Sequence, residues 1–132
     1  MKGYSGNIES TAKTNENFRE VLYTGKHSQL VVMSLAPKEE IGEEVHEDVD
    51  QFFRFEQGEG KVIIDDNEYV VADGDAIIVP SSAKHNVINA SAVEPLKLYT
   101  IYSPAEHRYD VKHMTKADAL ADNEHFDGKT SE

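Results

Sequence analysis

Side chains able to bind metals or move protons cluster at two places in this sequence. Glu44 and His46 are separated by one residue, so they point to the same face if this stretch is a β-strand. Gln51 follows after enough polar residues for the chain to turn and return on a neighbouring strand. His85 and Asn89 share one face of a later strand-like run. We therefore expect imidazole, carboxylate and amide groups to meet inside a β-structure.

Short strand-like runs occupy most of the chain from Phe18 to Tyr102. They are rich in Val, Ile, Leu and aromatic residues, and polar or glycine-bearing turns separate them. Such regular spacing predicts an all-β sandwich or closed barrel. Phe53 and Phe55 are in phase with Gln51 and are expected to face the interior. The predicted strands are 18–23, 29–35, 51–56, 61–64, 68–72, 76–79, 85–89 and 96–102.

The stretch that ends at residue 89 resembles the second cupin motif. That motif runs Gly, five residues, Pro, one residue, Gly, two residues, His, three residues and Asn. Four of its five positions are kept in this chain, and Ser82 stands where the family usually has glycine. The matching residues are Gly74, Pro80, His85 and Asn89.

The earlier stretch is similar to the first cupin motif, His-x-His, four residues, Glu, six residues and Gly. Glu44, His46, Gln51 and Gly58 stand at its positions with the spacing intact. The tract 30–102 also resembles the small bacterial cupins named mannose-6-phosphate isomerase-like. The resemblance implies a double-stranded β-helix, or jelly-roll, barrel. The pattern of the tail residues adds a short C-terminal helix on the outside of this barrel.

The resemblance also implies a metal centre at the matching positions. The usual cupin site holds three histidines and one glutamate, whereas two of these identities differ here. The resulting two imidazoles, one carboxylate and one amide oxygen still suit one divalent transition metal, with Fe, Mn, Ni and Zn as candidates. Two histidines with one carboxylate also resemble the triad of non-haem iron oxygenases. The expected ligands are Glu44, His46, Gln51 and His85.

A barrel without metal is the alternative interpretation of the same residues. Glu44, His46, Gln51 and His85 would then form a hydrogen-bonded polar cluster inside the barrel. An amide is a poorer ligand than imidazole, which favours this alternative. Four polar side chains in a barrel interior are unfavourable without partners, which favours the metal.

Three segments are expected along the chain. Residues 1–17 are polar and aperiodic and are expected to be an arm that is ordered only where it packs on something. Residues 18–114 form the barrel. Residues 115–132 contain a short helix over 115–126, started by Thr115 and Asp118, and a tail.

The remaining histidines carry weaker signals. His27 lies beside a turn and is expected at the surface. His107 and His113 follow the last strand, where they either line a pocket or face solvent. His125 lies in the expected tail helix and is assigned no role.

Charge and composition exclude several classes of partner. The 25 acidic and 13 basic residues give a net charge of −12, which disfavours nucleic acids and anionic membranes. No apolar run approaches the roughly 20 residues that span a bilayer, and the N-terminus lacks the apolar stretch of a signal peptide. The absence of cysteine excludes disulfides and thiolate metal sites. A cytoplasmic location is expected.

Three classes of function remain open at this point. The first is a metal-dependent enzyme, either an isomerase or epimerase or a dioxygenase, acting on a small polar molecule. The second is a small-molecule binding module, for example for a sugar or sugar phosphate. The third is a metal-free cupin that acts through its surface. In each case we expect a homodimer, in which the arm and the exposed strand edges are covered.

Overall fold

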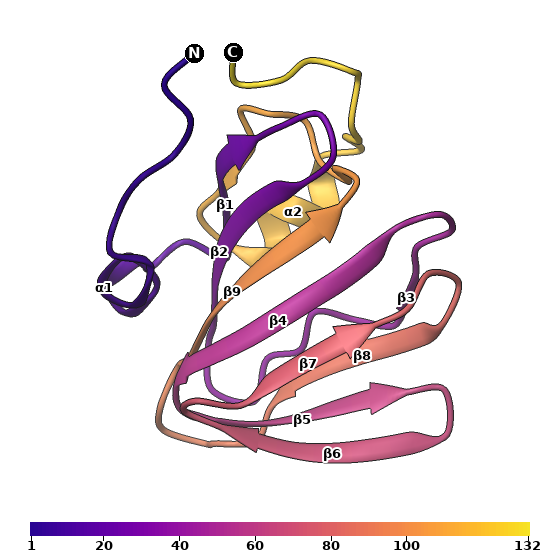
Figure 1. Ribbon diagram of the computed structural model, residues 1–132. Helices are drawn as coiled ribbons and strands as arrows, with labels where there is room; N and C mark the ends of the chain where they lie inside the picture. The colour runs from indigo at the N-terminus through magenta and orange to yellow at the C-terminus, as the bar shows by residue number, and fades with distance from the viewer.

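The computed structural model describes residues 1–132 as two antiparallel sheets with one short helix near each end (Figure 1). Each predicted strand is present, with ends within two residues of the prediction, and the all-β fold is confirmed. The elements are α1 (Ile8–Thr14), β1 (Arg19–Thr24), β2 (Gln29–Leu35), β3 (Glu44–Val45), β4 (Asp50–Gln57), β5 (Glu59–Ile64), β6 (Asn67–Ala72), β7 (Ala76–Val79), β8 (Lys84–Asn89), β9 (Leu96–Ser103), β10 (Lys112–His113) and α2 (Lys116–Ala121).

The two sheets face each other and enclose the core. One has six strands in the order β10-β1-β2-β9-β4-β7, and the other has four in the order β3-β8-β5-β6. Alternate residues of each strand point inward, and Met33 and Phe53 of the larger sheet join Val62 and Val87 of the smaller in one apolar cluster. Phe55 stacks beside Phe53, and both are fully buried, as expected.

Gly58 lies where the chain leaves β4 and is the residue at the last position of the first motif. Its φ is +99°, and a Cβ added there would lie 2.5 Å from the carbonyl oxygen of Pro95. Gly74 has a similar φ of +92° but open space around it. Ser82, which stands where the second motif usually has glycine, also has a positive φ of 73°. A left-handed backbone at this position explains why the motif favours glycine.

Replacing Gly58 with alanine is expected to lower the free energy of unfolding by about 2–4 kcal/mol, because backbone strain adds to the overlap with Pro95. Gly74→Ala is the matched control, because it introduces the strain without the overlap and should lose only about 1 kcal/mol. Urea unfolding of both variants measures the difference. Equal losses would contradict the role given to the Pro95 contact.

The N-terminal segment differs from the expected unstructured arm, because it contains α1. Asn7 caps this helix by accepting a hydrogen bond from the Ser10 N–H, and Lys13 pairs with Glu9 one turn away. Ala12 is fully buried on the side that faces β2, β4 and β9. The seven residues are too few to give a clear hydrophobic period, so the helix escaped prediction.

The C-terminal helix is shorter than the predicted 115–126. Thr115 and Asp118 form the expected capping box, but α2 ends at Ala121. The following residues are extended instead, because their side chains and backbone bind the barrel. Neither α1 nor α2 has the length and apolar character needed to cross a bilayer.

Candidate metal centre

Three of the four predicted ligands meet at one point of the interior. Glu44 of β3 lies directly opposite His85 of β8 in the antiparallel pair, so their side chains leave the ladder on the same face. His46 follows the end of β3, and its ring centroid lies 5.2 Å from that of His85. The candidate ligand atoms of Glu44, His46 and His85 lie within 4.8 Å of one another.

The ring of His85 is oriented with one nitrogen turned toward a backbone acceptor. Its Nδ1 lies 3.2 Å from the carbonyl oxygen of Ala83, so Nδ1–H is the donor and Nε2 keeps a free lone pair. Burial lowers the pKa of His85, and the positive charge of His46 lowers it further, against the hydrogen bond to Ala83. The neutral imidazole that results is the form that binds metals.

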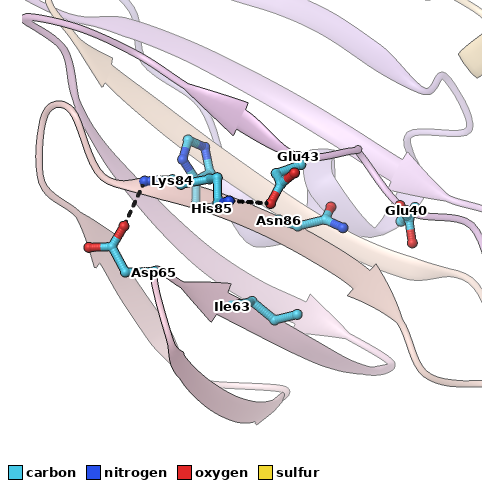
Figure 2. A pocket seen from close by; sticks show the side chains of 7 residues that line it. All are labelled: Glu40, Glu43, Ile63, Asp65, Lys84, His85 and Asn86. Carbon is cyan, nitrogen blue, oxygen red and sulfur yellow. Dashed lines mark hydrogen bonds and ion pairs between the residues drawn. The ribbon is translucent and has the colours of Figure 1, made fainter.

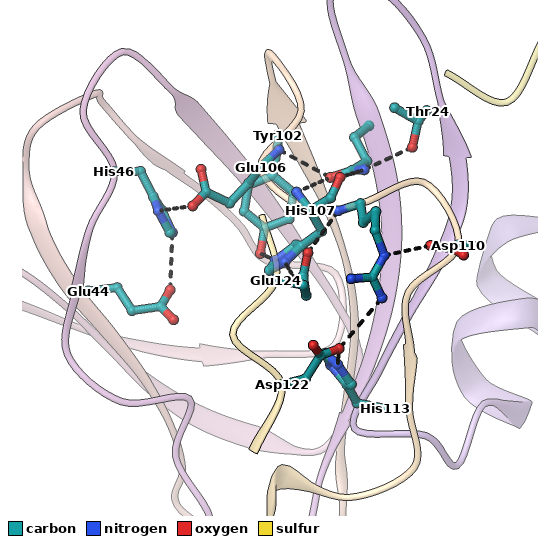
Figure 3. Close-up of polar contacts among 12 residues, drawn as sticks. Thr24, Glu44, His46, Tyr102, Glu106, His107, Asp110, His113, Asp122 and Glu124 are labelled. Atoms are coloured by element: carbon teal, nitrogen blue, oxygen red, sulfur yellow. Dashed lines mark hydrogen bonds and ion pairs between the residues drawn. The ribbon is translucent and has the colours of Figure 1, made fainter. Parts of the chain in front are cut away.

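His46 lies between two carboxylates (Figure 3). Its Nε2 lies 3.0 Å from Glu44 Oε2, and its Nδ1 lies 3.3 Å from Glu106 Oε1. Burial lowers the pKa of His46, but hydrogen bonds to Glu106 and Glu44 outweigh it and raise the pKa to about 9. Burial raises the pKa of Glu44, but the hydrogen bond to His46 outweighs it, and the net pKa lies below the usual value of a glutamate. Without metal, this part of the centre is an ion-paired cluster.

Gln51, the fourth predicted ligand, is buried on β4. Its Nε2 donates to Thr100 Oγ1 over 3.0 Å, while its Oε1 has no hydrogen-bond partner. Gln51 lies opposite Tyr102 in the β4–β9 ladder, and the Tyr102 ring lies 5.8 Å from the His46 ring. An unsatisfied buried amide oxygen is unfavourable by about 1–3 kcal/mol, and a cation would satisfy it. The donor set therefore fits a divalent transition metal.

Comparison with known proteins agrees with this architecture. A cupin-domain family model matches residues 31–102, which is more than half of the chain. The chain belongs to the cupin family. The expected resemblance is thereby confirmed.

Two bacterial proteins are similar to this cupin in sequence, and a third shares its fold. Uncharacterized protein YrkC of Bacillus subtilis is 46% identical over 126 residues, which cover 91% of this chain and 67% of YrkC. The crystal structure of BH2720 from Bacillus halodurans matches with a TM-score of 0.88 and 40% identity, covering 92% of this chain and 96% of that one. A predicted oxalate decarboxylase of Thermotoga maritima shares the fold alone, with a TM-score of 0.56 and 20% identity over 60% of this chain and 68% of that one.

Residues after the last long strand of the cupin barrel also belong to the centre. Glu106 binds His46, and His107 Nε2 lies 3.1 Å from the Tyr102 hydroxyl. His107 Nδ1 lies 2.6 Å from Glu124 Oε1 (Figure 3). Burial lowers the pKa of His107, so the neutral ring donates from Nδ1 to Glu124 and accepts the Tyr102 hydroxyl hydrogen at Nε2. No sequence motif marks Glu106 or Glu124, because their roles depend on how the chain folds back.

Arg19 is a third residue that the sequence did not single out, after Glu106 and Glu124. It lies opposite the core residue Met33 in the β1–β2 ladder, so it stands on the inner face of the sheet. Its side chain is buried, its Nε has no hydrogen-bond partner, and its guanidinium lies 5.3 Å from the centre of the Phe18 ring. Its positive charge also contributes to the lowered pKa of Glu44. The interior therefore contains a cation without a paired anion.

A surface depression of about 280 Å³ lies on the outer side of β8 (Figure 2). Ile63 and Asn86 line it, and both belong to the outward-facing positions of their strands. His85 alternates with Asn86 on β8 and is buried, and it also lines the depression (Figure 2). Lys84 pairs there with Glu43 over 3.2 Å. The depression therefore borders the candidate metal centre at His85.

The other histidines divide between surface and interior. His27 is exposed as expected, and His125 is exposed but lies beyond α2 instead of within it. His107 and His113 are both buried, so the solvent-facing interpretation of these two is wrong. His113 Nε2 lies 2.9 Å from Asp122 Oδ2.

The Glu124 contacts predict a pH-dependent stability. Burial raises the pKa of Glu124, but hydrogen bonds from His107 and from the Arg108 N–H outweigh it and hold the pKa below the usual value of a glutamate. A carboxylate whose pKa is lower in the folded than in the unfolded protein stabilises the fold at pH values above its unfolded-state pKa. This stabilisation is lost as the pH falls through the folded-state pKa. We expect Glu124→Gln to reduce the unfolding free energy by about 1–2 kcal/mol at pH 7. The difference from wild type should vanish in acid.

The measurement is urea unfolding of both proteins between pH 3 and pH 7. Asp127→Asn is the control, because Asp127 is exposed and accepts only from the nearby Lys129 N–H. A difference for Glu124→Gln that stays constant down to the lowest pH would contradict the ionised hydrogen-bond acceptor.

Proposed function

We propose that this cupin binds one divalent transition metal ion through Glu44, His46, Gln51 and His85. The observation that carries the proposal is the meeting of Glu44, His46 and His85 within 4.8 Å. The buried, unsatisfied oxygen of Gln51 supports it, because Tyr102, the ladder partner of Gln51, lies against His46. His46 and His85 would supply Nε2, because Glu106 and Ala83 hold the two Nδ1 atoms. Fe, Mn, Ni and Zn suit two imidazoles with carboxylate and amide oxygens.

We further propose that the centre holds or converts a small polar molecule, as an isomerase-like or dioxygenase-like enzyme or as a binding module. A bound metal supplies Lewis-acid polarisation of a carbonyl, or activation of dioxygen if it is iron. The apolar walls, including Phe53 and Phe55, exclude water from the interior. The unpaired buried charge of Arg19 favours a ligand that carries a negative group, because such a group would compensate it.

Metal analysis of protein purified without added metal tests the proposal. We expect about one metal ion per chain, or a rise in melting temperature when Fe, Mn, Ni or Zn is added to protein stripped with a chelator. Either of these two results would be incompatible with a metal-free barrel. Absence of bound metal together with unchanged melting would refute the metal centre and favour the metal-free alternative.

Two further measurements separate the kinds of function. Oxygen consumption by the iron-loaded protein with diketones, phenols and sugars identifies a dioxygenase. Melting of the metal-loaded protein with neutral and anionic members of the same panel identifies a binding module, and the anionic members are expected to stabilise more.

The homodimer remains a prediction. Exposed apolar residues on the edge strands β6 and β7 support it, because a second chain would cover them. They are Tyr69, Val70 and Ile78. Sedimentation velocity measures the mass, and a monomer at micromolar concentration would contradict the prediction.

A further inference from the structure

The extended segment 122–126, which follows α2, packs against the barrel with alternate residues. Asp122, Glu124 and Phe126 are half-buried, whereas the residues between them are exposed. The inward residues make contacts along the whole segment: Asp122 pairs with His113 at one end, and the Phe126 N–H donates to the Glu106 carbonyl over 2.9 Å at the other. No neighbouring strand pairs with this segment, so the alternation comes from the specific contacts that hold the segment on the barrel.

Glu124 makes the central contacts of this segment. One carboxylate oxygen lies 2.6 Å from His107 Nδ1, and the other accepts the Arg108 N–H over 2.8 Å. The Glu124 side chain is only 3% exposed, so these partners replace its solvent. Charge-assisted hydrogen bonds in such surroundings are among the stronger ones in proteins.

The stretch held by Glu124 also faces the metal centre. Glu106 contacts His46 Nδ1, and His107 contacts the Tyr102 hydroxyl, whose ring lies beside His46 (Figure 3). The side chain of the fully buried Gln29 also holds this stretch. Its Oε1 accepts hydrogen bonds from the backbone N–H groups of residues 106 and 107, and its Nε2 donates to the His107 carbonyl oxygen. The stretch 106–108 is thus fixed between Gln29 and the segment 122–126.

We propose that residues 122–126 form a C-terminal clamp on the metal centre, with Glu124 as a positioning residue. By holding residues 106–108, the clamp sets Glu106 against His46 and His107 against Tyr102. The effect on metal binding rests on the function proposed above, whereas the positioning of His46 and His107 operates without metal. Docking of the clamp and metal binding then favour each other, because a linkage between two equilibria is reciprocal.

The positioning is tested in the metal-free protein by the imidazole ¹⁵N signals of wild type and Glu124→Gln. Glutamine keeps the shape of the side chain but loses its charge. We expect the His107 signals to change directly and the His46 signals to change through Glu106. Asp127→Asn, in the same tail but outside the contacts, should leave both unchanged. A change confined to His107 would overturn the clamp, because a merely local hydrogen bond gives that result.

The linkage is tested with Zn²⁺ and a competing chromophoric chelator. We expect the dissociation constant of Glu124→Gln to rise by about tenfold, as for other groups that orient metal ligands, and that of Asp127→Asn to stay at the wild-type value. An unchanged constant in Glu124→Gln would contradict the linkage. If wild type itself binds no Zn²⁺, or any other metal tried, the proposed function fails, while the ¹⁵N signals still decide the clamp.

Amide hydrogen exchange in wild type needs no variant and covers the case in which Glu124→Gln does not fold. The Arg108 and Phe126 N–H groups donate to Glu124 and Glu106. Saturating Zn²⁺ should slow exchange at both amides, whereas the amide of the exposed Gly128 should exchange at the same rate. Equal exchange with and without bound Zn²⁺ would overturn the linkage.

Discussion

His85→Ala is expected to lose stoichiometric metal and to raise the dissociation constant for Zn²⁺ or Mn²⁺ at least about 100-fold. His85 is the one candidate imidazole whose Nε2 is free, because Ala83 accepts its Nδ1–H and no carboxylate pairs with it. Its removal leaves Glu44 and His46, which are already paired with each other. The loss should be measured as metal content after purification and as affinity in chelator competition.

His27→Ala is the matched control for this change. His27 is exposed beside the β1–β2 turn, so its replacement is expected to leave the metal content at the wild-type level. Circular dichroism of His85→Ala must show the β fold, so that loss of metal is not loss of structure. Wild-type metal uptake by a folded His85→Ala protein would remove His85 from the ligand set.

Gln51→Glu is expected to have opposite effects on the metal-free and the metal-loaded protein. Glutamate stands at this position in the usual cupin motif, so the substitution restores the common ligand. In the metal-free protein the new carboxyl group is buried, and this burial raises its pKa. At pH 7 this carboxyl group is either protonated against its ordinary pKa or buried as a charged carboxylate. Either form should lower the free energy of unfolding by about 3 kcal/mol.

With metal present, the same carboxylate adds a charged ligand, so the affinity should rise by about tenfold or more. Urea unfolding in chelator and in excess Zn²⁺ measures both effects. Gln57→Glu, a half-buried position of the same strand, is the control and should change neither strongly. If Gln51→Glu destabilises the protein equally with and without metal, Gln51 is not a ligand.

Much of the fold was predictable because its signals are local. Strand alternation and turn residues determined the eight predicted strands, and motif spacing identified Gly58, where a positive φ meets a close backbone approach. The convergence of Glu44 and His85 followed from the family resemblance and is explained by the direct pairing of β3 with β8.

The missing parts depend on contacts between residues distant in sequence. Glu106 and Glu124 resemble ordinary surface acids until the tail folds over residues 106–108. The same contacts end α2 at Ala121, because Asp122 and Glu124 turn toward the barrel instead of continuing the helix. His113 was ambiguous for the same reason, since its burial depends on Asp122 and β1.

The pairing of β3 with β8 has a consequence for metal selection. Glu44 and His85 project from two hydrogen-bonded neighbours in a ladder, so their separation is set by the sheet and changes little. His46 lies beyond the end of β3, where its carbonyl accepts the Ser82 N–H over 2.8 Å and its ring is held only by the side chains of Glu44 and Glu106. Its ring can therefore shift by a few tenths of an ångström. One stiff pair with one adjustable donor accommodates ions of different radius. We therefore expect weak discrimination between zinc and manganese, with occupancy following the supply of each ion in the cell.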